Sequence, residues 1–134
     1  MRRIETNPVK KQLGGKTVLV VEDDPSIRKR VQAAFTSNGF AVCGEADNGK
    51  EGIDLAKEIK PDVIILDLSM PVMNGLEAAP QLKKLFPRTP IILFTLHANA
   101  LLQQQAAHIG VDFVMSKFAG LANLVKKAHA LIGD

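Results

Sequence analysis

The chain has 134 residues, of which 46% are hydrophobic and 23% are charged, with a net charge of +3. This composition is typical of a single globular domain and excludes a disordered chain, and the longest apolar runs are far too short to span a bilayer. The only cysteine, Cys43, excludes an internal disulfide and a cysteine-based zinc cluster.

The positive charge is concentrated at the N-terminus. Residues 1–16 carry five Lys or Arg residues and one Glu, which gives this segment a charge of +4 and the rest of the chain −1. We interpret residues 1–15 as a flexible basic leader and residues 16–134 as the folded domain. We expect no direct nucleic-acid binding by the folded domain. The alternative is that the leader contacts nucleic acid or an acidic partner. Because no signal-peptide pattern is present, we expect a cytoplasmic protein that does not associate with membranes.

Five short runs of β-branched and apolar residues predict strands. They lack the polar alternation of half-exposed strands, which favours strands of a parallel sheet buried on both faces. In chain order, these runs are Thr17–Val21, Phe40–Gly44, Val63–Leu66, Ile91–Phe94 and Phe113–Met115.

A segment with helical spacing of apolar residues follows each predicted strand. These segments are Ile27–Phe35, Ile53–Ile59, Leu76–Leu85, Leu101–Ile109 and Leu121–Ile132. Strict alternation predicts an α/β fold, in which a doubly wound five-stranded parallel sheet lies between two helical layers. Pro80 falls inside the third predicted helix, where it removes a backbone donor, so we expect a kink or a shortened helix there.

Polar side chains follow four of the predicted strands. Glu22 and Asp23 come after the first strand, Asp67 after the third, Thr95 after the fourth and Lys117 after the fifth. Ligands of open parallel sheets bind outside the carboxyl ends of the strands, so we expect these five side chains to converge at one edge. Singly, each has a plainer interpretation as a helix cap, a strand residue or a solvated lysine; together they predict a site.

The residue types at this edge indicate phosphoryl chemistry. Clustered carboxylates repel one another, and Mg²⁺, with Mn²⁺ as the alternative ion, offsets that repulsion through the oxygen ligands it prefers. Thr95 and Lys117 donate hydrogen bonds of the kind that phosphoryl oxygens accept. An ionised Asp67 at the end of a rigid strand is therefore the candidate nucleophile.

These residues resemble the receiver domain of two-component response regulators. The resemblance covers about residues 16–132 and is carried by Val-Leu-Val-Val-Glu-Asp-Asp-Pro (18–25), Leu-Asp-Leu-Ser-Met-Pro-Val-Met-Asn-Gly (66–75), Thr95 and Ser-Lys (116–117). It implies a flavodoxin-like sheet with strand order 2-1-3-4-5. The segments 44–49 and 66–78 look most like receivers that precede helix-turn-helix DNA-binding domains.

The resemblance also implies roles for individual residues. Asp67 would accept a phosphoryl group from a sensor histidine kinase, Thr95 and Lys117 would contact that group, and Glu22, Asp23 and Asp67 would bind Mg²⁺ together with the backbone carbonyl of Ser69. The protein would then be a switch with self-catalysed phosphotransfer and autodephosphorylation rather than an enzyme.

The same resemblance implies an output surface formed by the helix 101–109, the strand 113–115 and the helix 121–132. Phosphorylation would change how this surface binds an output domain, a downstream protein or a second copy of the chain.

Two of the positions that depart from the family pattern bear on switching. Val114 stands where an aromatic switch residue is usual, and Phe113, one residue away, should face the other side of the sheet. Leu96 stands where a small residue is usual, and its bulk would narrow access to Asp67. An alternative function is therefore a receiver-fold interaction module with weakened or phosphorylation-independent switching, and a magnesium-dependent enzyme acting on small phosphorylated molecules is a third.

Overall fold

A computed structural model describes residues 15–133 of the chain. Its sheet contains five parallel strands in the order β2-β1-β3-β4-β5, which confirms the predicted fold class and strand order. The strands are β1 (Thr17–Val21), β2 (Ala41–Ala46), β3 (Val63–Asp67), β4 (Ile91–Thr95) and β5 (Phe113–Ser116). Each lies within two residues of its predicted bounds.

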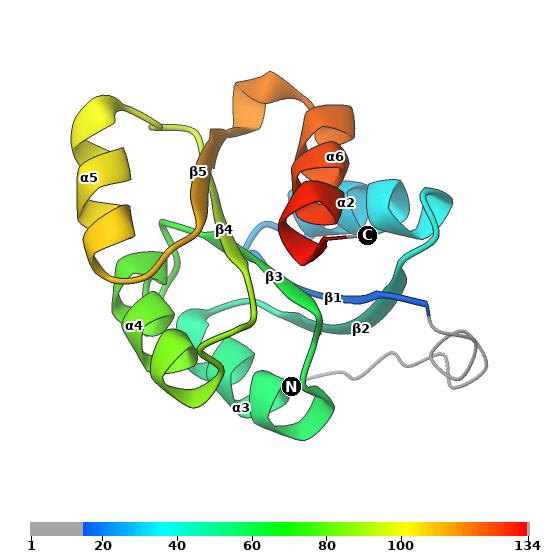
Figure 1. Ribbon diagram of the computed structural model, residues 1–134, viewed down its shortest axis with the longest axis horizontal. Coiled ribbons are helices and arrows are strands. Elements are labelled where there is room, and N and C mark those ends of the chain that lie inside the picture. The colour runs from blue at the N-terminus through cyan, green and yellow to red at the C-terminus, as the bar shows by residue number, and fades with distance from the viewer. Residues whose placement is uncertain (1–14, 134) are drawn as a thin grey trace.

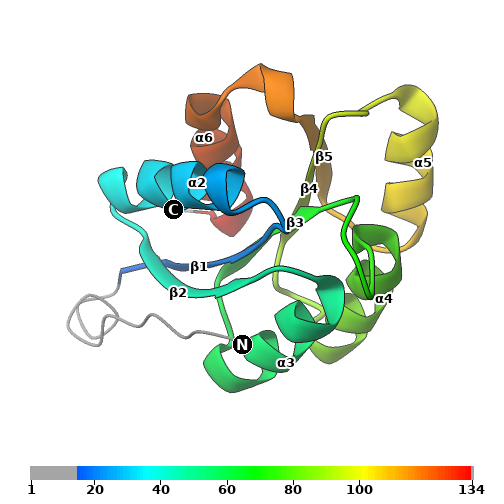
Figure 2. The same cartoon turned by 180° about the vertical axis from the view of Figure 1, so that it is seen from behind.

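Helices cover both faces of this sheet, so the domain has three layers (Figures 1 and 2). Helices α3, α4 and α5 pack on one face, and α2 and α6 pack on the other. The helices are α2 (Pro25–Ser37), α3 (Gly49–Ile59), α4 (Gly75–Leu85), α5 (Ala100–His108) and α6 (Leu121–Ile132), with a short 3₁₀ turn η1 (Lys117–Ala119) before the last.

The strands lack polar alternation because both of their faces are buried. Leu19 and Val21 belong to the core beneath α3, α4 and α5, whereas Val18 and Val20 belong to the core beneath α2 and α6. Successive side chains of a strand point to opposite faces, so a strand between two helical layers needs apolar residues at every position.

Four helices begin at the same edge of the sheet with an Asp or Asn cap. The side chains of Asp24, Asn48, Asn74 and Asn99 accept hydrogen bonds from backbone N–H groups in the first turns of α2, α3, α4 and α5. These caps satisfy donors that would otherwise have no partner. Asp24, the last of the three consecutive acidic residues after β1, is therefore the N-cap of α2.

Helix α4 does not end at Pro80, so the expectation of a shortened helix is wrong. The helix continues for five more residues to Leu85. A reciprocal capping box between Asn74 and Glu77 stabilises its start, and Ala79 and Leu82 on either side of the proline are buried in the core. The burial of this face offsets the missing backbone hydrogen bond, and a kink at Pro80 stays a prediction.

The register of the sheet brings the ends of its central strands together. Val21 of β1 pairs with Leu66 of β3, Asp67 of β3 pairs with Phe94 of β4, and Thr95 of β4 pairs with Ser116 of β5. Polar residues at or just beyond these pairs thus share one edge.

The predicted basic leader lies, apart from Gly15, outside the described residues, and the domain boundary at residue 16 stays a prediction. Within residues 15–133, no helix combines the length and the apolar character that crossing a membrane requires.

The loop between β3 and α4 contains a strained residue. Val72 has a φ of +66°, and its side chain is 78% exposed. The N–H of Met73 donates to the carbonyl of Pro71 at 2.6 Å, which closes a tight three-residue turn around Val72. A β-branched residue at positive φ is a steric outlier, so this turn costs conformational energy that no burial of the side chain returns.

We predict that Val72→Asn stabilises the domain by about 1 kcal/mol, because asparagine tolerates a positive φ better than a β-branched residue does. Chemical unfolding followed by far-ultraviolet circular dichroism measures this, since the chain has no Trp or Tyr. Leu101→Asn is the control, because Leu101 is also exposed but lies within α5. An equal or lower stability of Val72→Asn would contradict the assignment of strain to this turn.

Candidate functional site

Asp67 is the last residue of β3, and the start of α4 packs closely against its backbone. Its side chain lies in a largely buried position, with the residue 6% exposed. The N–H of Gly75 donates to the carbonyl of Leu68 at 2.9 Å, and a Cβ atom on Gly75 would collide with the backbone carbonyl of Asp67. Glycine therefore lets the helix approach the strand closely enough to fix the backbone of Asp67.

Glu22, Asp23 and Asp67 form an acidic cluster at this edge. One carboxylate oxygen from each residue lies within 4.8 Å of those of the other two. Glu22 is 4% exposed, whereas the side chain of Asp23 faces solvent. The cluster is thus partly closed and partly open to ions from solution.

Lys117 is the positive charge inside the cluster. Its Nζ donates to Oε1 of Glu22 at 2.7 Å and lies 3.2 Å from Oδ1 of Asp67. The side chain of Ser116 caps the η1 turn that begins at Lys117 by accepting from the N–H of Phe118. One largely buried lysine therefore bridges two buried carboxylates, which lie at the ends of β1 and β3.

Burial shifts the pKa of each of these groups. Removal from water, opposed by the hydrogen bond from Lys117, raises the pKa of Glu22 to about 7, and burial likewise raises the pKa of Asp67. Burial alone would lower the pKa of Lys117, but the hydrogen bond to Glu22 and the charge of Asp67 outweigh it and raise the pKa. Lys117 therefore stays charged, whereas burial disfavours the charged carboxylate forms of Glu22 and Asp67.

A pocket of about 260 Å³ opens over this cluster. Its lining residues are Glu22, Asp23, Asp24, Ile27, Asp67, Ser69, Thr95, Leu96, His97 and Lys117. The structure thus brings together every predicted site residue except Val114.

Thr95 and Leu96 form one wall of this pocket. Thr95 is buried, and its Oγ1 accepts a hydrogen bond from the N–H of His97 at 3.2 Å. Leu96 is 49% exposed and lines both this pocket and a neighbouring one toward Phe118. The leucine therefore lies where a bulky side chain can restrict approach to Asp67.

Val114 lies outside the pocket, in the core beneath α3, α4 and α5. Phe113 packs instead against the core on the opposite face, as its position one residue earlier in the strand predicts. No aromatic ring of β5 therefore lies on the face occupied by Val114.

The residues of the cluster fit a hard divalent cation. All three acidic side chains offer oxygen, which Mg²⁺ prefers, and Ser69 lines the same pocket. Ionising Glu22 and Asp67 so close together is unfavourable in their buried setting, and a cation would remove that cost. Ile27 and His97 complete the lining and were not predicted, because they carry no signal in the sequence beyond their place in the chain.

Comparison with known proteins gives a consistent family. A model of the response regulator receiver domain matches residues 18–129. The chemotaxis protein CheY of Thermotoga maritima is 35% identical over 105 residues, which cover 78% of this chain and 88% of that protein. A putative transcriptional regulator of Pseudomonas aeruginosa is 36% identical over 115 residues, which cover 86% of this chain but only 56% of the regulator.

Solved structures agree with the sequence relatives. The receiver domain of the putative response regulator NarL from Mycobacterium tuberculosis superposes with a TM-score of 0.83 at 29% identity. The match covers 89% of this chain and 97% of that domain.

We predict that the metal-free protein loses stability as the pH rises from about 5 to 7. The folded chain keeps the Glu22 carboxyl protonated up to about pH 7, whereas the unfolded chain releases this proton near the ordinary pKa of 4.5. The folded state thus binds more protons in this window, so its stability falls with rising pH, by on the order of 2 kcal/mol.

Unfolding with denaturant in the presence of a chelator, repeated across this pH range, measures the slope. Glu22→Gln should flatten it, whereas Glu58→Gln, at an exposed position of α3, should keep it. Equal slopes for the wild-type protein and Glu22→Gln would contradict the assignment.

Proposed function

The chain belongs to the response regulator receiver domain family, and on this premise we propose that Asp67 accepts a phosphoryl group from a sensor histidine kinase and thereby changes a partner-binding surface. The observation that carries the proposal is Lys117, which lies 2.7 Å from Glu22 and 3.2 Å from Asp67 in one small pocket. A lysine between a nucleophilic carboxylate and a second carboxylate suits a site that gains negative charge.

Asp67 is the nucleophile in this proposal. A carboxylate oxygen of Asp67 forms a bond to phosphorus, the bond from phosphorus to the donor histidine nitrogen breaks, and that nitrogen keeps the electron pair. Hydrolysis reverses the change, because water forms the new bond to phosphorus and the carboxylate of Asp67 leaves. The rigid end of β3 keeps the attacking oxygen in place.

Thr95 and Lys117 serve the phosphoryl oxygens as donors. Lys117 reaches the phosphoryl oxygens when its Nζ moves away from Oδ1 of Asp67. Thr95 reaches them when its hydroxyl proton turns toward the pocket. Mg²⁺, held by Glu22, Asp23 and Asp67 with the backbone carbonyl of Ser69, would supply positive charge that offsets the charge of the phosphoryl oxygens. Mn²⁺ offers the same charge and ligand preference.

We predict that incubation with Mg²⁺ and acetyl phosphate adds about 80 Da to the wild-type chain and nothing to Asp67→Asn, because amide nitrogen and oxygen cannot replace the carboxylate nucleophile. Intact mass spectrometry measures the adduct. Asp47→Asn, at an exposed position before α3, is the matched control and should gain the same mass as the wild-type protein.

An unchanged mass of the wild-type chain, with acetyl phosphate and with a phosphorylated histidine kinase as donors, would favour a second function. The receiver-fold interaction module then becomes the better description. Val114 favours this alternative, because it is a small residue packed in the core at the position where an aromatic switch residue is usual in the family.

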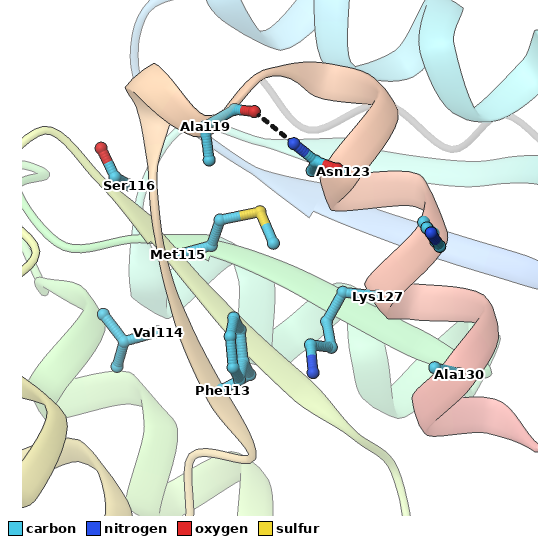
Figure 3. Close-up of a pocket in the computed structure, with 9 residues that line it drawn as sticks. Phe113, Val114, Met115, Ser116, Ala119, Asn123, Lys127 and Ala130 are labelled. Atoms are coloured by element: carbon cyan, nitrogen blue, oxygen red, sulfur yellow. Dashed lines mark hydrogen bonds between the residues drawn. The ribbon is translucent and has the colours of Figure 1, made fainter.

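The proposed output surface includes α5, β5 and α6. A groove of about 470 Å³ lies between β5 and α6, with Phe113, Met115 and Ala130 among its apolar residues (Figure 3). Lys127 lies over the ring of Phe113 at 4.0 Å, and Lys126 lines the same groove. Because residues 113–133 contain no Asp or Glu, this groove suits a downstream protein or output domain with an acidic segment better than it suits a second copy of itself.

We predict that phosphorylation shifts backbone amide resonances of β5 and α6 more than those of α3, because Lys117 connects the site directly to η1 and α6. Two-dimensional nitrogen–proton spectra, recorded before and after acetyl phosphate, measure this. Asp67→Asn treated in the same way is the control. Changes confined to the pocket residues would contradict a switch at this surface.

A further inference from the structure

Arg28 reaches beneath the acidic cluster from the first turns of α2. Its Nη1 donates to the backbone carbonyl of Glu22 at 2.7 Å. The guanidinium is largely buried, with its side chain 14% exposed, and it does not line the pocket above the cluster. This contact is therefore with the backbone that carries the acidic residues and not with their carboxylates.

The other edge of the guanidinium is held by β2. Nε of Arg28 pairs with Oε1 of Glu45 at 3.3 Å, and Nε2 of Gln32 donates to Oε2 of the same carboxylate at 3.3 Å. Glu45 thus has both oxygens engaged, and Arg28 is fixed between β2 and the end of β1. Arginine suits this position because its planar group donates in two directions at once.

The carbonyl of Glu22 belongs to the peptide bond that joins Glu22 to Asp23. This peptide sets the direction in which the two carboxylates leave the backbone, one buried and one facing solvent. On either side of it, the N–H of Glu22 donates to the carbonyl of Ala46, and the N–H of Asp24 donates to Oε2 of Glu22. Arg28 supplies the restraint on the carbonyl itself.

We propose that Arg28 is a positioning residue for the divalent cation site, acting through the Glu22–Asp23 peptide and supported by Glu45. The inference rests on the proposed function, because it takes the acidic cluster to bind Mg²⁺. The ion pair with Glu45 has a second effect: it neutralises a guanidinium that would otherwise repel the cation. Loss of Arg28 weakens cation binding because the Glu22–Asp23 peptide is no longer restrained. Loss of Glu45 weakens it because the positive charge of Arg28 is no longer neutralised.

Calorimetric titration of the full chain with Mg²⁺ tests this, since the readout is the affinity of the folded protein and not its phosphorylation. We expect Arg28→Gln to weaken binding about tenfold, in the range typical of residues that orient metal ligands. Arg28→Lys, which can still donate to the carbonyl of Glu22, should lose less. Glu45→Gln should also weaken binding, and the double variant should lose less than the sum of the two single changes.

Lys29→Gln is the matched control, because Lys29 is the exposed neighbour on the same helix and should bind Mg²⁺ as the wild-type protein does. Denaturant unfolding in chelator separates positioning from a merely structural bridge between α2 and β2. Lower stability with unchanged Mg²⁺ affinity in Arg28→Gln and Glu45→Gln overturns the inference. If Arg28→Gln does not fold, Arg28→Lys and Glu45→Gln carry the same test.

The wild-type titration distinguishes this inference from the proposed function. If the wild-type protein binds Mg²⁺ and the Arg28 and Glu45 variants bind it with the same affinity, the positioning role is overturned and the Mg²⁺ site stands. Absence of wild-type binding overturns the metal site in the proposed function, and the positioning role with it.

Discussion

The site depends on the burial of like charges at one edge of the sheet. Glu22 and Asp67 are almost fully buried, and the only cation that contacts both within residues 15–133 is Lys117. Removal from water disfavours the charged form of both acids and is the main reason that their pKa values are raised, while Lys117 opposes that shift. The surrounding structure must hold these groups together in their buried positions, so this edge of the sheet has to be rigid.

That rigidity comes from backbone contacts rather than from the charged groups themselves. The parallel register sets the ends of β1, β3, β4 and β5 at the same level, and the Asp and Asn caps fix the helices that begin there. Gly75 lets α4 approach the carbonyl of Asp67, and Arg28 holds the carbonyl of Glu22. The start of α4 thus packs against the backbone of Asp67, and Arg28 donates to the carbonyl of Glu22, so the backbone is restrained on both sides of the cluster.

Most of the fold and the composition of the site could be predicted from the sequence because both depend on local patterns. Uninterrupted apolar runs identify strands buried on two faces, and the carboxyl ends of such strands meet at one edge whatever the details of packing. Asp24 shows where sequence position and role diverge, since it directly follows Glu22 and Asp23 but caps α2 instead of joining their cluster. Arg28, on α2, could not be identified at all, because its proposed role depends on a contact with Glu45, 17 residues away on β2. The length of α4 beyond Pro80 was likewise decided by burial of the helix face, which overrides local propensity.

Val114 bears on how a change at Asp67 reaches the surface. A valine packed in the core cannot exchange between buried and exposed positions as a long aromatic side chain can, so the face of β5 toward α5 offers little movement. The backbone from Ser116 to Leu121 offers more, because it contains Lys117, a single 3₁₀ turn capped by Ser116, and Gly120 at a φ of +95°. In the proposed function, a shift of the Lys117 side chain toward a phosphoryl group would act on this segment directly, and the segment leads into α6 and the groove lined by Lys126 and Lys127. In this protein, the shortest physical route from Asp67 to the proposed output surface therefore runs along the chain after β5 rather than through a rotating ring on β5.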